Sequence, residues 1–495
     1  MKGSPQRLLV SLMPVGAIII VLLLNGCTVG PNFHPPQSTA PGEWVGITQQ
    51  AVGQTSMVTV GPVDLVRWWQ QFDDPILNSL VEDALTANLD LKVAEGRLRQ
   101  ARAIRGVTAG GLWPAITVSG GYLRLHKTGD SPGDQDLYQA GLDALWELDV
   151  FGGKRRAVES ADAGIRAAIE NVRDVQVSLT AEVALNYIQL RGYQQEILIA
   201  QNNLEAQKQT ADITHRRLNV GFASALDVAN ADSNVATTES QIPVFQSAAR
   251  QSIYSLSTLL ARLPADLVGQ LSPMNSLPHV PAQIPVGLPS DLLRRRADVR
   301  EAEAQLHSAT AQIGVAVADF FPSFSLTGTV NWSSDVLHSW WSAGSRAFAI
   351  GPSVSWPIFQ GGAIVSNVRL QEALRDQAYI SYEKTVLSAF QDVESAMIAF
   401  AKEQQHLNAL NAAVAANRKA VELSLELYRE GLSDFLNVLN AQRSLYLSED
   451  ALVQSERSIA ADLIALYKAL GGGWESLPEP ASIVLENRDL TRRND

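Results

Sequence analysis

The 495-residue chain contains a single cysteine, Cys27, so it cannot form an intramolecular disulfide bond. Positive charge is also scarce and scattered: the formal net charge is −12, and no run of Lys and Arg is longer than three residues. Because binding to nucleic-acid phosphates needs clustered Lys or Arg, we do not expect a nucleic-acid partner.

Long apolar runs are almost missing as well. Only Leu8–Leu24 approaches the roughly 20 residues that span a bilayer, and Pro14 interrupts it. No stretch of 18 apolar residues follows it. This excludes a membrane protein built of many spanning helices, so any passage of the mature chain through a membrane would need a closed β-barrel.

Motifs of catalysis and metal binding are also missing. The seven histidines show neither HxxxH nor HExxH spacing, and the chain has no GxSxG elbow or GxxxxGK[ST] phosphate loop. We therefore expect no enzyme activity, no catalytic residue, no metal ion and no cofactor other than a covalent lipid.

That lipid is indicated by the surroundings of Cys27. Lys2 and Arg7 precede the apolar run and Gly26 precedes the cysteine, which is typical of a secretory signal over residues 1–26. The letters LNGC at Leu24–Cys27 resemble the bacterial lipobox, although Asn25 departs from the commoner Ala or Ser. We expect cleavage before Cys27 and its acylation; a transmembrane anchor and an unmodified cysteine are the alternatives.

The remaining sequence contains an internal duplication. LDLKVAEGRL at Leu89–Leu98 matches ADVREAEAQL at Ala297–Leu306, and VGFASALDVANA at Val220–Ala231 matches EGLSDFLNVLNA at Glu430–Ala441. We therefore expect the following parts: an N-terminal lipidated segment (27–75), a first repeat (76–270), a Pro-rich linker (271–289), a second repeat (290–474) and a C-terminal tail (475–495).

Each repeat contains two segments in which apolar and polar residues alternate, as in strands with one apolar face. They lie at about 115–126, 138–151, 323–333 and 346–359. This pattern fits a soluble sandwich as well as a barrel, but lengths of about ten residues and terminal aromatic residues such as Trp146 favour outer-membrane strands. Four strands cannot close, so a barrel requires several chains.

Helical patterns flank the strands. Gly153–Gly221 holds no proline and would form a helix about 100 Å long at 1.5 Å per residue. Ile76–Gly110 and Phe222–Arg262 predict helices of about 50 and 60 Å, and Ser290–Ala318 corresponds to the first of these in the second repeat. We expect a long helix beside two shorter, stacked ones; a soluble coiled coil is the alternative.

Several stretches resemble the TolC-type outer-membrane factors, and most closely the NodT-like lipoprotein branch that serves resistance-nodulation-division efflux systems. They run from Cys27 to Trp474 and include CTVGPNFHPP, LPSDLLRRRADVREAEAQL, FFPSFSLTG, WPIFQGG and YEKTVLSAFQDVESA. The resemblance implies a mainly α fold with a membrane β-barrel: a homotrimer with a 12-stranded barrel on an α-helical tunnel, and an equatorial part formed partly by the linker and terminal segments.

The resemblance also implies a function. The trimer would be a passive exit duct in the outer membrane of a Gram-negative bacterium, lipid-anchored and extending into the periplasm. It would dock with a periplasmic membrane-fusion adaptor and an inner-membrane efflux transporter. The exit duct of a type I secretion system and a non-pore periplasmic lipoprotein are the alternatives, and the exported substrate is not encoded in any motif.

By resemblance, Gly221 and Gly431 mark the hairpin turns at the periplasmic tip where the adaptor docks. The aperture gate carries over to six positions, of which Leu436 is expected to pack and Arg443 to pair with Asp227 or a nearby backbone group. The family often has acidic residues where this chain has Asn437 and Asn440. The six positions are Asp227, Tyr428, Leu436, Asn437, Asn440 and Arg443.

Overall fold

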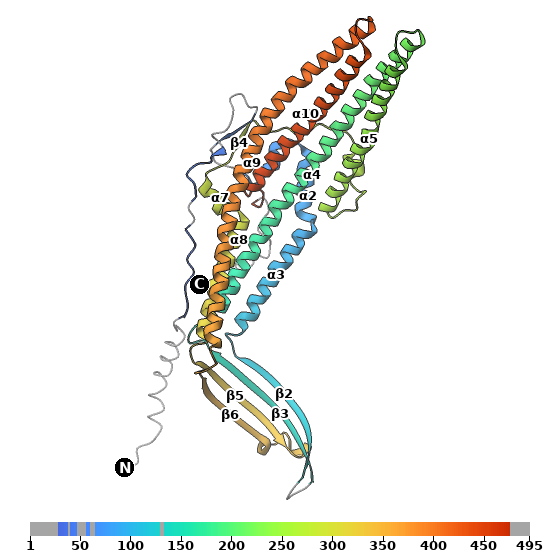
Figure 1. The fold of residues 1–495 in the computed structure, drawn as a ribbon. Coiled ribbons are helices and arrows are strands. Elements are labelled where there is room, and N and C mark those ends of the chain that lie inside the picture. The colour runs from blue at the N-terminus through green and yellow to red at the C-terminus, as the bar shows by residue number, and fades with distance from the viewer. Residues whose placement is uncertain (1–27, 38–39, 47–55, 60–64, 129–132, 476–495) are drawn as a thin grey trace, which may run out of the picture. The chain divides into compact units, whose positions relative to one another are not determined.

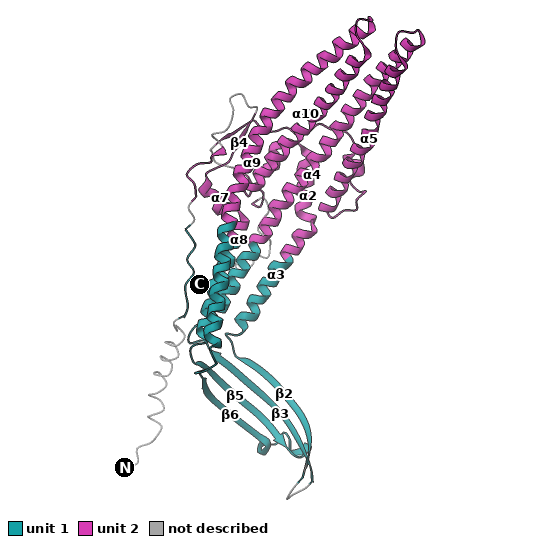
Figure 2. Ribbon diagram, viewed as in Figure 1, with its two compact units in different colours: residues 1–37, 96–169, 301–384 teal, residues 38–95, 170–300, 385–495 magenta. Residues whose placement is uncertain are grey.

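The computed structural model describes residues 28–37, 40–46, 56–59, 65–128 and 133–475 (Figure 1). The chain is mostly helical and divides into two compact units (Figure 2). Unit 1 contains residues 96–169 and 301–384 with the described part of 1–37. Unit 2 contains the described parts of 38–95, 170–300 and 385–495.

The two repeats form the same series of elements. Three pairs of corresponding helices have equal lengths: 22 residues in α3 and α8, 67 in α4 and α9, and 35 in α5 and α10. The first series is α2 (Pro75–Ala87), α3 (Leu89–Gly110), β2 (Ala115–Lys127), β3 (Gly133–Leu148), α4 (Gly153–Asn219) and α5 (Ala225–Leu259). The second is α7 (Pro289–Arg295), α8 (Ala297–Ala318), β5 (Ser323–Ser334), β6 (Arg346–Ser355), α9 (Ala363–Arg429) and α10 (Phe435–Ala469).

The first helical segment of each repeat is broken, which differs from the single helices expected over Ile76–Gly110 and Ser290–Ala318. Asn88 separates α2 from α3 and has non-helical backbone angles. Its side-chain oxygen accepts a hydrogen bond from the backbone amide of Leu91 (3.0 Å), and its side-chain nitrogen Nδ2 donates to the carbonyl of Leu259 (2.8 Å). The asparagine therefore caps the new helix and fastens the break to α5.

Unit 1 contains a four-stranded antiparallel sheet in the order β2-β3-β5-β6. β3 begins at Gly133, earlier than the expected residue 138, because its first residues continue to pair with β2 up to Lys127. β6 ends at Ser355 rather than near residue 359. Pro357 follows shortly after, and proline has no amide hydrogen with which to continue a ladder.

The register gives the sheet two chemically different faces. Val118, Leu142, Val330 and Phe348 lie opposite one another across the four strands, and so do Ile116, Ala144, Gly328 and Ile350. On the other face, Thr117, Asp143, Thr329 and Ala349 form a corresponding row. Ile116, Val118, Phe348 and Ile350 are each at least 72% exposed, so the apolar face is uncovered in the single chain.

Aromatic residues lie at both ends of this sheet. Where the strands join the helices, the indole of Trp146 donates to the carbonyl of Leu112 (2.9 Å), and that of Trp356 donates to the carbonyl of Phe320 (3.0 Å). At the other end, rings pack in pairs with centroids 5.1–5.3 Å apart: Tyr122 with Tyr138 and Trp332 with Trp341. Such amphipathic rings suit a boundary between apolar and polar surroundings.

Unit 1 also fixes the described start of the chain. Val29 donates its amide to the carbonyl of Phe151 (3.1 Å), while the Nε of Arg156 donates to the carbonyl of Val29 (3.1 Å). Gly30 lies so close to Gly314 that a Cβ on Gly30 would come within 2.4 Å of the Cα of Gly314. A pair of glycines therefore lets this segment contact α8 directly.

Unit 2 has its core around η2 (Trp68–Phe72). Trp68 is fully buried and stacks on Tyr467 of α10 with ring centroids 5.2 Å apart. Nearby, β1 (Met57–Thr59) pairs in parallel with β4 (Gln283–Pro285). The Pro-rich linker therefore supplies a strand, preceded by the short helix α6 (Val268–Leu271), and this strand ties the linker to the N-terminal segment.

Candidate functional site

The turns between paired long helices have the same backbone geometry in both repeats. Gly221 follows α4 with φ = +80°, and Gly431 follows α9 with φ = +78°. In each turn the next residue donates its amide back over five positions: Phe222 to the carbonyl of Arg217 and Leu432 to that of Leu427, both at 2.8 Å. This is a Schellman motif, in which glycine takes up the left-handed conformation that other residues rarely adopt.

Each turn also exposes two apolar side chains four residues apart. Phe222 is 74% and Leu226 is 68% exposed in the first turn, and Leu432 is 71% and Leu436 is 57% exposed in the second. Exposed leucines and a phenylalanine so close together form apolar surface that a partner can cover. Leu436, a predicted gate residue, thus belongs to the exposed part of its turn and not to the core.

The two turns differ in the way the next helix begins. Ser224 and Asp227 form a capping box at the start of α5: the Ser224 hydroxyl accepts from the amide of Asp227 (3.1 Å), and the Asp227 carboxylate accepts from the amide of Ser224 (2.9 Å). At α10 the capping residue is Asp434, whose side chain makes no such bond. Asn437, which stands where the first turn has Asp227, donates to the hydroxyl of Ser433 (3.0 Å).

Behind the turns, side chains of four helices form one buried cluster, here called the tip cluster. Tyr428 is 3% exposed and packs its ring 5.7 Å from that of Phe435, while its hydroxyl donates to that of Thr214 (3.4 Å). Tyr428, predicted as a gate residue from the sequence, is therefore a central member. The cluster consists of Ala211, Ala231, Tyr428, Phe435, Val438 and Leu439.

Arg217 links the two hairpins at this level, and the sequence analysis did not identify it. Its Nη1 donates to the carbonyls of Tyr428 (2.8 Å) and Arg429 (3.2 Å), and its guanidinium lies 4.7 Å from the centre of the Tyr428 ring. A cation at the last carbonyls of a helix satisfies groups that have no partner within the helix. Arg217 on α4 therefore caps the end of α9.

Two further polar contacts join the hairpins. The amide of Gln442 donates to the hydroxyl of Thr210 (2.8 Å), and the Nε of Arg443 donates to the side-chain oxygen of Asn234 (3.3 Å). Within the chain Arg443 thus meets an amide on α5 rather than the Asp227 carboxylate. Asn440 is exposed. Thr210 and Thr214 are one helical turn apart on α4, a spacing that could have drawn attention to them.

Nearer the middle of unit 2, α4 and α10 meet at a buried acidic residue. The Glu196 side chain is 2% exposed and lies 3.3 Å from the Nη1 of Arg457. The guanidinium of Arg457 also lies 5.1 Å from the Tyr193 ring centre. Burial raises the pKa of Glu196 to about 7; Arg457 opposes this shift and Asp450 adds to it.

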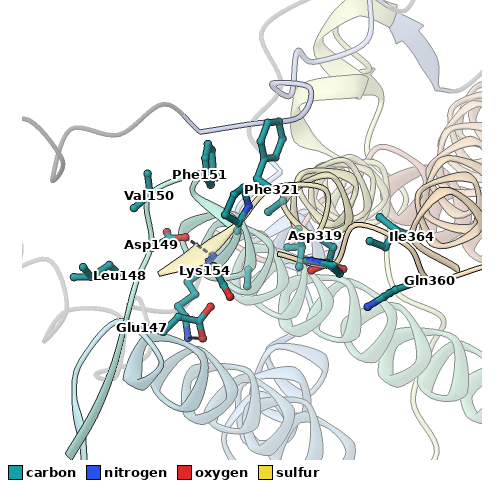
Figure 3. Close-up of a pocket in the computed structure, with 17 residues that line it drawn as sticks. Glu147, Leu148, Asp149, Val150, Phe151, Lys154, Asp319, Phe321, Gln360 and Ile364 are labelled. Atoms are coloured by element: carbon teal, nitrogen blue, oxygen red, sulfur yellow. Dashed lines mark hydrogen bonds and ion pairs between the residues drawn. The ribbon is translucent and has the colours of Figure 1, made fainter. Parts of the chain in front are cut away.

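A separate pocket of about 560 Å³ lies in unit 1 where strands turn into helices (Figure 3). The Asp149 carboxylate accepts from the amides of Lys154 (3.0 Å) and Arg155 (2.9 Å), the first free amides of α4. The ammonium of Lys154 pairs with Glu147 at 3.1 Å. These contacts stabilise the corner between the end of β3 and the start of α4.

Neither a helical membrane span nor a metal site is found in the described ranges. No described helix has the length and apolar character that crossing a membrane would require. No group of three or more His, Cys, Asp or Glu side chains there is arranged to hold a metal ion.

A family model described as outer membrane efflux protein matches residues 80–262 and 288–472, one match for each repeat. The chain belongs to the outer membrane efflux protein family. The recognition made from the sequence is therefore confirmed. As a member of this family, the protein is an outer-membrane channel of tripartite efflux pumps in Gram-negative bacteria and extends into the periplasm.

Curated relatives of this family match almost the whole chain. Nodulation protein T of Rhizobium leguminosarum bv. viciae is 33% identical over 469 residues, covering 94% of this chain and 95% of its own. A probable efflux pump outer membrane protein, TtgC of Pseudomonas putida, is 32% identical over 464 residues, covering 92% and 94%.

Solved structures of the family have the same fold. The outer-membrane channel OprN is 38% identical with a TM-score of 0.83, covering 91% of this chain and all of its own. The open state of the Neisseria gonorrhoeae MtrE outer membrane channel is 28% identical with a TM-score of 0.77, covering 91% and 99%.

Replacing Arg217 by Met should loosen the end of α9. A hydrogen bond to a charged group contributes about 1.5–3 kcal/mol, so amide hydrogen exchange around Tyr428–Leu432 should become roughly tenfold faster or more. Arg216→Met is the matched control, since the neighbouring Arg216 is exposed and pairs with Asp212 on its own helix. Equal exchange in both variants would show that Arg217 does not fasten the turn.

Glu196 should make stability depend on pH. Its pKa is raised from 4.5 to about 7 in the folded chain, so the unfolded chain ionises first as the pH rises, and stability is lost between about pH 4.5 and 7. This loss is on the order of 3 kcal/mol at most. Thermal unfolding of Glu196→Gln should therefore show a flatter pH profile than the wild type over this interval.

The exposed Glu205, on the same helix, provides the control for this measurement. Glu205→Gln should keep the wild-type slope. Parallel profiles for Glu196→Gln and the wild type would contradict the role given to Glu196.

Proposed function

We propose that three copies of this chain close into one passive exit duct, with a 12-stranded barrel in the outer membrane and an α-helical tunnel in the periplasm. The observation that carries this proposal is the open sheet of unit 1. Within the described chain, β2 and β6 are paired on one side only, along 13 and 10 residues. Unpaired amides and carbonyls cannot remain in hydrocarbon, so each edge needs a strand from another copy.

The two faces of the sheet support the same arrangement. A closed ring of these sheets would turn the uncovered apolar rows toward lipid and the rows of Thr, Ser and Asp toward the interior. Rings of aromatic residues at both ends of the strands are typical of the two lipid–water boundaries.

The helices of unit 1 carry matching unpaired surfaces. On α3, which precedes the edge strand β2, Ile104 and Val107 are 51% and 81% exposed. On α9, which follows the opposite edge strand β6, Leu370 and Ile380 are 54% and 63% exposed. Two different apolar edges on one chain suit head-to-tail contacts, and such contacts form a closed ring when the rotation between copies is right.

The hairpin turns of unit 2 at Gly221 and Gly431 are proposed to dock with a periplasmic membrane-fusion adaptor, which connects the duct to an inner-membrane efflux transporter. Positive φ at both positions favours glycine, and glycine has no side chain to block the close approach of a partner's backbone. The exposed Phe222 and Leu432 beside them offer apolar contacts to the partner.

The aperture gate is proposed to involve Asp227, Tyr428, Leu436, Asn437, Asn440 and Arg443. Tyr428 would stabilise the gate through the tip cluster, and Arg443 would do so through its hydrogen bond to Asn234. The exposed Leu436 and the two asparagines would contact neighbouring copies. Because asparagines stand here where the family often has acidic residues, the ring they form would attract cations less strongly than a ring of carboxylates.

Acylation of Cys27 is proposed to add an anchor. Cys27 lies outside the described residues, but Thr28 lies beside Gly152, where a Cβ on the glycine would come within 2.7 Å of the threonine. The chain is therefore already fixed to the strand–helix corner of unit 1 one residue after the attachment point. A lipid there supports membrane binding without being its main source, since a single chain binds membranes only weakly.

A charge on the apolar face of β6 should prevent insertion of the protein into the outer membrane. Ile350→Lys places an ammonium in the apolar face, at a cost of about 2–4 kcal/mol if it lies near the bilayer centre. Ala349→Lys is the matched control on the next position, where the side chain belongs to the polar face. Outer-membrane fractions should contain at least roughly tenfold less trimer for Ile350→Lys; equal amounts of both variants would contradict the assigned faces.

Reversing the charge of Arg443 should open the gate. Purified protein in planar bilayers should conduct ions, and Arg443→Glu should raise the single-channel conductance because the contact with Asn234 is lost. Arg250→Glu, an exposed position on α5 away from the turns, is the control. Unchanged conductance in Arg443→Glu would argue against a gating role, and a protein that never conducts would argue against the duct.

A further inference from the structure

The two repeats meet inside unit 1, where α4 of the first repeat packs against α8 of the second; this contact is here called the repeat boundary. The helix bounds show which positions of the repeats are equivalent. α9 begins at Ala363, 210 positions after α4 begins at Gly153, and α8 begins at Ala297, 208 positions after α3 begins at Leu89. In a ring of copies, the second repeat of one copy meets the first repeat of the next. There α9 takes the place of α4, and α3 takes the place of α8.

The repeat boundary consists of polar and closely packed contacts. Ser160 on α4 is 4% exposed, and its hydroxyl accepts a hydrogen bond from the Nε2 of Gln312 on α8 (2.8 Å). Arg156, one helical turn before it, lies against Gly314: a Cβ on this glycine would come within 2.7 Å of the Cγ of Arg156. The face of α4 that carries Arg156 and Ser160 is therefore covered.

The equivalent positions on α9 and α3 are apolar and uncovered. Leu370 of α9 stands at the position of Ser160, and Ile104 of α3 stands at that of Gln312. Their side chains are 54% and 51% exposed. Gly106 stands at the position of Gly314, and a Cβ on it would meet nothing within 4 Å. An apolar side chain that is exposed at a position buried in the other repeat indicates a surface that a further chain covers.

Charged groups at the two places also correspond. His307 on α8 lies between two groups of α4, the Glu159 carboxylate (2.9 Å) and the Arg166 guanidinium (2.8 Å). The equivalent residues are Arg99 of α3 and Arg369 and Asp376 of α9. One cation and one anion therefore flank this position in both cases, in opposite order, although Asp376 also pairs with its neighbour Arg375 (2.9 Å). Exposed ion pairs contribute little, so the apolar residues and not these charges carry the contact.

The strands correspond with the same spacing as the helices. Ala115 lies opposite Leu145 in the first repeat, and Ser323 lies opposite Ser355 in the second. β5 therefore follows β2 by 208 positions and β6 follows β3 by 210. Because the four strands of one copy alternate in direction, β6 would run antiparallel to β2 of the next copy, as β3 runs antiparallel to β5.

This correspondence gives the contact between copies a register. Gln139 of β3 lies opposite Ser333 of β5. The equivalent pair between copies is Ala349 of β6 and Leu125 of β2, and both lie on the polar face. A shift by one residue would place the apolar face of one copy beside the polar face of the next. A shift by two residues keeps the faces, and the pairing seen between β3 and β5 decides against it.

We propose that the contact between neighbouring copies repeats the repeat boundary. α9 packs on α3 of the next copy with Leu370 against Ile104, and β6 pairs with β2 of the next copy with Ala349 opposite Leu125. This inference rests on the proposed exit duct and identifies the surfaces by which its copies join. The contact between copies is apolar at the place where the repeat boundary is hydrogen-bonded.

Paired cysteines test the helix contact, since the sequence contains only one other cysteine, Cys27. Ile104→Cys and Leu370→Cys are introduced together, and the full-length protein is oxidised in outer membranes with copper phenanthroline. Disulfides join residues whose Cα atoms lie within about 7 Å, so covalently linked dimers and trimers should appear on non-reducing gels.

Ile104→Cys with Ile380→Cys is the matched control for this pair. Ile380 is also an exposed apolar residue of α9 (63%) but lies ten residues beyond Leu370, which is about 15 Å along a helix. The control should give at least roughly tenfold fewer linked chains. Each single-cysteine variant should give unlinked chains.

Ala349→Cys with Leu125→Cys tests the strand register in the same way. The matched control replaces Leu125→Cys by Leu123→Cys, two residues along β2 on the same face. Directly opposite Cβ atoms lie about 4.5–5.5 Å apart and diagonal ones about 7–8 Å, so the first pair should link at least roughly threefold more completely. More complete linking with Leu123→Cys would show a register shifted by two residues and overturn the inference for the strands.

Equal linking by Ile104→Cys with either partner, or linking with Ile380→Cys alone, would overturn the proposed helix contact. Sedimentation of the unoxidised variants in detergent measures their oligomeric state separately. Trimers that do not link at the predicted pairs would overturn this inference alone, whereas monomers would contradict the duct as well.

Discussion

The backbone amides and carbonyls at the outer edges of β2 and β6 set the constraint on which the rest of the structure depends. A sheet of four strands with one apolar face leaves that face uncovered in water and cannot close alone in lipid. The proposed duct would solve both problems by adding the same sheet from other copies. The uncovered rows on α3 and α9 agree with this proposal, because helices that continue from edge strands would also lie at the edges between copies.

The duplication explains how a single chain supplies all parts of such an assembly. Each repeat contributes one strand pair and one pair of long helices, and the linker between them returns as β4 beside β1. Unit 2 is fastened by residues from distant parts of the sequence, with Trp68 stacked on Tyr467 and Asp74 bonded to Tyr187. These contacts join the segment before the first repeat to both repeats.

Periodicity carried most of the sequence-based prediction. Successive side chains of a strand point to opposite faces, so the alternation of apolar and polar residues around Leu142 predicts which face is apolar. The lack of proline in Gly153–Gly221 predicts the long helix α4. The break at Asn88 was not predicted from periodicity; besides its local cap of α3, Asn88 makes a hydrogen bond to Leu259, a residue of another helix. Propensity alone does not contain that contact.

The turn region shows the same limit. Gly221 and Gly431 were predicted as hairpin turns from the sequence, and their positive φ angles explain why glycine stands there. Tyr428 was predicted as a gate residue from the resemblance to the family. Arg217 was missed because an arginine near the end of a helix is most often a surface charge. Its role follows only from the position of the α9 carbonyls, which lie 211 and 212 positions further along the chain.

The unequal capping of the two turns has a consequence for the assembled duct. Three copies would present six hairpins in a ring, alternating between one whose helix start is fixed by Ser224 and Asp227 and one whose capping side chain is unbound. The proposed ring would then keep threefold symmetry, with six hairpins of two alternating kinds. Movement at the periplasmic end would begin at the weaker hairpins, while the fixed ones would keep a constant surface for the partner.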